Sequence, residues 1–250
     1  MEIMTYNEKK VLDEIRTSMK LFTNFGYDTE NEDDDNIYHC LQPLFKKNKV
    51  QYAKGMTKMC LIPATGNWVM KVPFQGEYIS VWNDEIEDYE DDLAFESYSG
   101  AENGTSNHWD YCLSEVYCYD LAEESGIGEF FAKEEYFGEV ATSSSKETLP
   151  CYVQEKCYTI RDIWGHEGAP QASEDSLKKV KSNDKYRYSG YFCKEWLAIA
   201  IDYYGEEKVL ALLKFLDENR WMSGDFHEGN YGYRVSDNSP VLIDYTGFFN

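Results

Sequence analysis

The most constraining feature of the sequence is a polar segment near the C-terminus that is followed by a short apolar strand. The segment reads Asp225-Phe-His-Glu-Gly-Asn230, and Pro240-Val-Leu-Ile-Asp244 follows shortly after it. An Asp, an Asn five residues later and an Asp at the end of an apolar strand can organise a hydroxyl nucleophile and Mg²⁺ around a nucleotide. The alternative is that Asp225 and Asn230 only cap turns, as these residue types commonly do.

The composition restricts the class of protein. A hydrophobic content of 42% with 16% aromatic residues is typical of a folded globular chain. The net charge of −22 disfavours direct binding to nucleic acid or to an anionic membrane, because phosphate contacts need Lys and Arg. The seven cysteines form no Cys-x-x-Cys pair, so neither a zinc site nor a disulfide framework is indicated.

The sequence also predicts a cellular location. It contains no apolar run of the ~18 residues that a membrane-spanning helix requires. Its N-terminus lacks the basic and then apolar pattern of a signal peptide. We therefore expect a cytoplasmic protein with reduced cysteines and no membrane partner.

Two runs, residues 28–35 and 83–92, hold much of the acidity. Such runs are usually solvated loops, and this is the structure that we predict for both. The alternative is an acidic surface that binds a basic partner or mimics nucleic acid.

Periodicity predicts an alternation of helical and strand segments. Apolar residues at helical spacing indicate the helices, and Gly- and Pro-containing turns separate the strands. A long surface insertion is expected from the second acidic run to Asn107. The expected elements are a helix over 8–25, two or three strands over 50–74, a helix over 109–125, strands over 130–138 and 151–157, helices within 175–221, and a hairpin over 231–243.

The polar segment and this element order resemble the protein-kinase-like superfamily, and the motif is closest to that of aminoglycoside phosphotransferases. The resemblance implies an α+β fold with a β-rich N-lobe carrying one long helix, and a small, mainly helical C-lobe ending in a β-hairpin. The implied domains are an N-terminal helical extension (1–49), a kinase-like N-lobe with an acidic insertion (50–156), and a truncated helical C-lobe with the catalytic loop and metal strand (157–250).

The resemblance also assigns roles within the polar segment. Asp225 corresponds to the catalytic base that accepts the proton of an attacking hydroxyl. Asn230 and Asp244 correspond to the residues that hold Mg²⁺, an ion that prefers oxygen ligands. A structural, hydrogen-bonding role is expected for His227.

A nucleotide site is implied upstream. Lys71, in Trp-Val-Met-Lys-Val, resembles the strand lysine that pairs with nucleotide phosphates. The family pairs this lysine with a glutamate on a helix, and we expect Glu115 in that role, with Glu123 or Glu124 as the alternatives.

Two further segments complete the expected ATP site. Backbone amides over residues 55–58 could cradle phosphate at a turn containing Gly55, with Lys58 or Lys54 adding charge, although a simple hairpin turn explains the same pattern. The segment Gln154, Glu155 and Lys156 is expected to connect the lobes and to bind adenine through its backbone.

The chain departs from the family pattern in its supporting residues. Ser223-Gly224 precedes Asp225, and Tyr245-Thr246 follows Asp244 where the family has Phe-Gly. The sequence ends six residues after Asp244, so the region with which protein kinases dock peptides is not seen. These features leave the acceptor unidentified, either a small molecule or a protein.

The leading hypothesis is therefore a compact kinase-like phosphotransferase that uses Mg-ATP to phosphorylate a hydroxyl acceptor. Nucleotidyl transfer on the same fold remains an alternative. So do a pseudokinase-type binding protein without turnover and an acidic protein that binds a partner or mimics nucleic acid.

Overall fold

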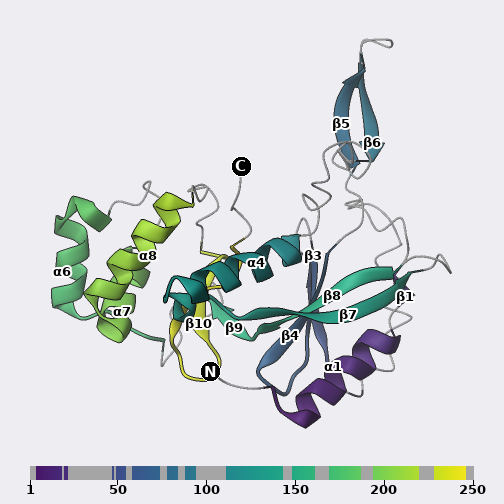
Figure 1. Cartoon of the computed structure of the whole chain (residues 1–250), viewed down its shortest axis with the longest axis horizontal. Helices are drawn as coiled ribbons and strands as arrows, with labels where there is room; N and C mark the ends of the chain where they lie inside the picture. Colours follow the sequence, from purple (N-terminus) through teal and green to yellow (C-terminus); the bar gives the residue numbers. More distant parts are fainter. Residues whose placement is uncertain are drawn as a thin grey trace. The chain divides into compact units, whose positions relative to one another are not determined.

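The computed structural model is a mixed α+β structure whose strands pair largely antiparallel (Figure 1). The chain folds into two compact units. The first comprises residues 1–113 and 135–154, and the second comprises residues 114–134 and 155–250. The structure describes residues 4–18, 20–21, 47, 49–54, 58–73, 78–83, 88–93, 111–142, 148–160, 169–186, 194–219 and 228–245.

The first unit is built on a six-stranded sheet with the order β1-β7-β8-β4-β3-β2. Strands β2, β3 and β4 form consecutive antiparallel pairs, as the turns between them predict, whereas β1 pairs in parallel with β7. The strands of this sheet are β1 (Lys20–Leu21), β2 (Gln51–Lys54), β3 (Lys58–Ile62), β4 (Trp68–Pro73), β7 (Glu134–Thr142) and β8 (Thr148–Glu155).

Helix α1 (Tyr6–Ser18) packs on one face of this sheet. Thr5 and Glu8 form a capping box, in which the Glu8 N–H donates to the Thr5 hydroxyl and the Thr5 N–H donates to the Glu8 carboxylate (2.8 Å). Leu12 and Ile15 are buried on the sheet with core residues of the strands. The predicted extension thus supplies part of the core of the first unit.

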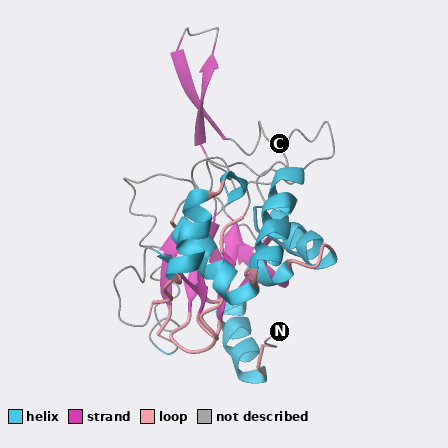
Figure 2. Ribbon diagram, turned by 90° about the vertical axis from the view of Figure 1, so that its left-hand side faces the viewer, coloured by secondary structure: helices cyan, strands magenta, loops and turns pink. Residues whose placement is uncertain are grey.

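Two predicted elements of the first unit have different limits in the structure. The helix expected over 8–25 ends at Ser18, because Lys20 and Leu21 pair as a strand with Ala141 and Thr142. The acidic run that was expected to be a loop contains strand β6 (Asp88–Leu93). It pairs with β5 (Tyr78–Asn83) in a separate two-stranded sheet, drawn as magenta arrows in Figure 2.

The second unit combines a three-stranded sheet, ordered β11-β10-β9, with helices. Its core contains Phe130, Phe131, Trp196, Leu216 and Tyr245. The elements are α4 (Tyr111–Glu124), whose first turn belongs to the first unit, η2 (Gly128–Phe130), β9 (Cys157–Thr159), α6 (Glu174–Ser182), η3 (Asp184–Tyr186), α7 (Lys194–Tyr204), α8 (Glu206–Glu218), β10 (Tyr231–Arg234) and β11 (Pro240–Leu242).

Most boundaries in the second unit follow the predicted pattern. Helix α4 is followed by Gly126, whose positive φ of 73° suits a residue without a Cβ at a helix end. Gly205, with φ of 90°, separates α7 from α8. The strand expected over 130–138 begins only at Glu134, because residues 128–130 form a 3-10 turn. No helix within the described ranges has an apolar stretch long enough to cross a membrane.

Candidate metal and nucleotide site

The two predicted metal ligands, Asn230 and Asp244, lie beside each other in the second unit. They flank the open end of the β10–β11 hairpin, where Tyr231 pairs with Leu242. The backbone carbonyl of Asn230 accepts a hydrogen bond from the Ile243 N–H (2.8 Å), and the Asp244 N–H approaches the same oxygen at 3.4 Å. The hairpin register thus brings together two residues that are well separated in sequence.

Glu115 reaches the same region from α4. It is completely buried, and its Oε1 accepts a hydrogen bond from the N–H of Tyr245 (3.3 Å), the residue after Asp244. Burial raises the pKa of the neighbouring Cys118 thiol, and the charge of Glu115 raises it further. Of the alternative glutamates, Glu123 is exposed and accepts a hydrogen bond from Tyr119. Of these glutamates, Glu115 is the one with a hydrogen bond to the segment after Asp244.

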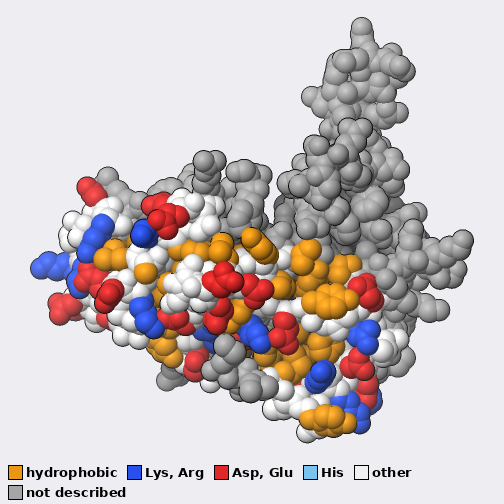
Figure 3. Space-filling model, in the orientation of Figure 1, with side chains coloured by type: hydrophobic (Ala, Val, Ile, Leu, Met, Phe, Trp, Pro, Cys, Tyr) orange, Lys and Arg blue, Asp and Glu red, His pale blue; other side chains and the backbone are white. Residues whose placement is uncertain are grey.

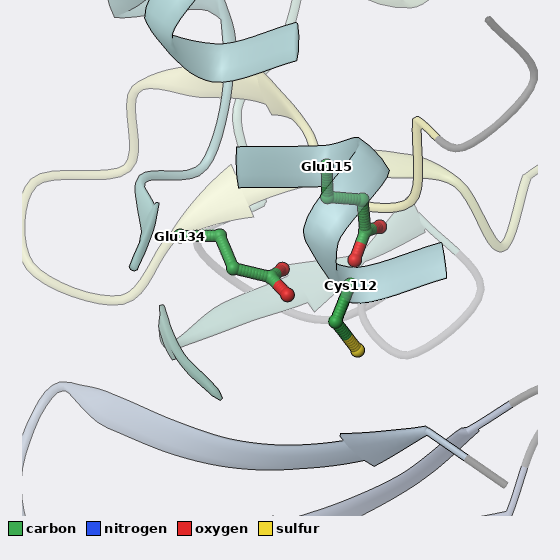
Figure 4. Close-up of side chains that lie close together, drawn as sticks. All are labelled: Cys112, Glu115 and Glu134. Atoms are coloured by element: carbon green, nitrogen blue, oxygen red, sulfur yellow. The ribbon is translucent and has the colours of Figure 1, made fainter. Parts of the chain in front are cut away.

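A second group of candidate ligands surrounds Glu115. Figure 4 shows Cys112, one turn earlier on α4, and Glu134, at the start of β7, close to the Glu115 carboxylate. One ligand atom from each of the three side chains lies within 4.8 Å of the others, and all three residues are buried. This group was not predicted from the sequence. The i, i+3 spacing of Cys112 and Glu115 was a signal for part of it, but nothing local connected Glu134 to α4.

The chemistry of the donor atoms distinguishes the two groups. Mg²⁺ prefers oxygen ligands and retains several waters, so the amide oxygen of Asn230 and the carboxylate of Asp244 fit this ion. A set that includes the Cys112 thiol is better suited to a softer metal ion. The hairpin end is therefore the better candidate for a magnesium site.

Three predicted nucleotide-binding residues share one face of the sheet in the first unit. Leu61, Met70 and Val153 belong to the core on the α1 side. Because successive strand residues point to opposite faces, Cys60, Lys71 and Gln154 lie on the other side. Cys60 pairs directly with Lys71, and Lys58, two residues before Cys60 in β3, lies on the same face. Lys58, Lys71 and Gln154 are all buried, with 8%, 4% and 1% exposure.

The residues that connect β8 to β9 form backbone hydrogen bonds with other residues of the second unit. The Glu155 N–H donates to the carbonyl of Lys133 (2.9 Å), and the Lys156 carbonyl accepts from the N–H of Val235 (3.0 Å). Burial lowers the pKa of the Lys156 ammonium. The predicted adenine contact would therefore use other backbone groups of this segment, and it stays a prediction.

Three of the residues with a predicted role lie outside the described part of the chain, as does the acidic run 28–35. They are the expected catalytic base Asp225, its neighbour His227, and Gly55 of the expected phosphate turn. Their roles rest on the sequence alone.

Comparison of the sequence with known proteins returned no relative: neither a protein-family model nor a curated protein matches it.

Proposed function

We propose that this chain is a compact kinase-like phosphotransferase that uses Mg-ATP to phosphorylate a hydroxyl acceptor. The observation that carries the proposal is the hydrogen bonding around the Asn230 carbonyl, which sets two oxygen-bearing ligands side by side at one end of a hairpin. The order of the surrounding parts agrees with it. A hairpin, β2–β3, leads to the strand that carries Lys71, and a helix carrying Glu115 comes before the β10–β11 hairpin.

The predicted residues have separate roles in the proposed phosphoryl transfer. Asn230 and Asp244 would hold Mg²⁺, which neutralises charge on the phosphate oxygens. Lys71 would contact the nucleotide phosphates. Asp225 would accept the proton of the acceptor hydroxyl as its oxygen forms a bond to the γ-phosphorus and the bond to the ADP oxygen breaks.

The described residues on one face of the molecule give no support to nucleic-acid mimicry. A mimic needs a continuous acidic face. On the face in Figure 3, the acidic side chains of the described residues are interspersed with basic and hydrophobic ones. Several of the described acidic side chains also form ion pairs, such as Glu14 with Lys47 and Glu206 with Lys179.

Calorimetric titration of ATP, with and without Mg²⁺, into the wild type and Asp244→Asn tests the proposal. The matched control is Asp237→Asn, which makes the same change at an exposed position in the turn of the same hairpin. We expect Mg²⁺-dependent binding in the wild type and in the control. Loss of the carboxylate in Asp244→Asn should weaken Mg²⁺-dependent ATP binding by about tenfold or more, because a hydrogen bond to a charged group contributes about 1.5–3 kcal/mol.

The outcomes separate the alternatives. Absence of nucleotide binding by the wild type would overturn the proposal. Binding without phosphate release or transfer to any hydroxyl compound tested would instead support the pseudokinase-type alternative. AMP transfer in place of phosphate transfer, detected by mass spectrometry of the acceptor, would indicate nucleotidyl transfer.

A further inference from the structure

Tyr245, the residue after the proposed metal ligand Asp244, is anchored at both its backbone and its side chain. Its side chain is completely buried, and its ring meets Phe131 edge-on, with centroids 5.2 Å apart and an interplanar angle of 85°. The phenol hydroxyl donates a hydrogen bond to the carbonyl of Ala132 (2.6 Å). The backbone N–H donates to Glu115, as described above.

These contacts fix the backbone on the C-terminal side of Asp244. On the N-terminal side, Ile243 is already held by the carbonyl of Asn230. Ala132 is itself fixed, because its N–H donates to the carbonyl of Leu242 (2.8 Å) in β11. Asp244 therefore lies between two anchored residues, and the residue is only partly buried.

We propose that Tyr245 is a positioning residue, whose hydroxyl bond to Ala132 holds Asp244 where it binds the magnesium of a magnesium–nucleotide complex. This inference rests on the proposed function and deepens it. A phenylalanine at this position would keep the ring packing and lose the anchor. The tyrosine hydroxyl is therefore expected to set the position of the metal ligand, in addition to filling the core.

The test is the Tyr245→Phe variant, with Tyr204→Phe as the matched control. The Tyr204 hydroxyl also donates to backbone carbonyls, those of Glu129 (2.9 Å) and Pro240 (3.0 Å), but it does not contact Asp244, Tyr245 or Glu115. Both variants remove a phenol hydroxyl that donates to a backbone carbonyl in the second unit, Tyr245 from a buried position and Tyr204 from a half-buried one, so both should lose thermal stability. Only loss of the Tyr245 hydrogen bond to Ala132 should make the position of Asp244 less fixed.

Two quantities are measured in each protein: the Mg²⁺ concentration that half-saturates ATP binding, and the hydrogen exchange of the amides from Ile243 to Tyr245. In Tyr245→Phe we expect the Mg²⁺ requirement to rise and the exchange to accelerate, each by up to about tenfold, which is the scale of one lost hydrogen bond. ATP affinity without Mg²⁺ should stay the same, and Tyr204→Phe should behave like the wild type in both measurements.

An unchanged Mg²⁺ requirement in Tyr245→Phe, or an equal shift in Tyr204→Phe, would overturn the positioning role. Unchanged exchange at Asp244 would overturn the anchor itself, whether or not nucleotide binds. Failure of the proposed function is distinguishable, because it is seen in the wild type as the absence of any Mg²⁺-dependent binding.

Discussion

Arg234 and Glu155 form a largely buried ion pair that joins strand β10 to the residue at which β8 ends. The Nε of Arg234 lies 2.8 Å from Oε2 of Glu155, and each side chain is 13% exposed. Arg234 also donates to the carbonyl of Phe131 (2.8 Å) and to the hydroxyl of Ser239 (2.8 Å). Glu155 accepts a further hydrogen bond from the N–H of Lys133 (3.0 Å). The pair therefore links β10 of the three-stranded sheet to the end of β8 and to the segment of Phe131 and Lys133.

Replacement of Arg234 by Met should destabilise the protein strongly, because it leaves Glu155 as a buried charge without its ionic partner. Breaking one side of a buried ion pair costs about 3–5 kcal/mol. The control is Lys214→Met, which removes an exposed pair with Glu218 that is worth at most about 1 kcal/mol. Urea unfolding of both variants measures the difference. Equal free energies of unfolding would show that the Arg234 network contributes little.

Replacement of Gly232 by Ala should also destabilise the second unit, for a steric reason. Gly232 pairs with Thr159 across β9 and β10, and a Cβ at this position would overlap the carbonyl oxygen of Tyr158. The strands would have to separate, which we expect to cost about 3 kcal/mol, at the upper end for overpacking. Gly126→Ala is the comparison, since its Cβ would meet no atom within 4 Å and only the positive φ is strained, at about 1–2 kcal/mol. Urea unfolding should show a larger loss of unfolding free energy in Gly232→Ala than in Gly126→Ala. An equal loss in both variants would contradict the steric explanation.

The pH dependence of stability should contain a contribution from Glu206. Hydrogen bonds from Lys179, Lys185 and Tyr186 lower the pKa of this carboxyl from 4.5 to about 2. A lowered pKa in the folded state means that the stabilisation is complete above pH 4.5 and is lost as the pH falls towards 2.

The Glu206→Gln variant measures this contribution. Its melting temperature should lie below that of the wild type at neutral pH, and the difference should shrink as the pH is lowered from about 5 to about 3. Glu207→Gln, at the exposed neighbouring position, should show little difference at any pH. A constant deficit of Glu206→Gln across this range would contradict the assigned ionisation.

Cys60 should report on the proposed nucleotide site. It is half-buried and lies directly opposite Lys71 in the register of β3 and β4. Bound Mg-ATP is therefore expected to slow its alkylation by iodoacetamide, by about tenfold at a nucleotide concentration about ten times the Kd. Peptide mapping by mass spectrometry gives the rate at Cys60 alone. In Asp244→Asn the same nucleotide concentration should give at most about twofold protection, because the affinity falls by about tenfold or more. Equal rates with and without nucleotide in the wild type would show that the ligand binds elsewhere.

Local signals predicted those parts of the fold that depend on neighbouring residues. The turns of the β2–β4 meander and the end of α4 before Gly126 could be predicted because Pro fixes φ and Gly permits a positive φ, so both act locally. The parallel pairing of Lys20 with Ala141 could not be predicted, because it joins segments that are far apart in the sequence. The strand at Asp88–Leu93 was missed because its charges indicate a loop, whereas its pairing with β5 determines its backbone.

The residues of the candidate site also fall into those that the sequence could predict and those that it could not. Asn230 and Asp244 could be found because one spaced motif contains both, and the hairpin register then places them together. Glu134 and Tyr245 could not be found in this way. Glu134 reaches Glu115 only through the packing of α4 beside the start of β7, and the bond from Tyr245 to Ala132 joins residues that share no motif.

The two faces of the sheet in the first unit have a consequence for how this protein could change over evolutionary time. Leu61, Met70 and Val153 hold the fold from the α1 side, whereas Lys58, Lys71 and Gln154 stand on the opposite face. Exchanges among residues of the second face could alter the proposed nucleotide contacts while the apolar contacts with α1 persist. New specificities could therefore arise on this sheet without a new core.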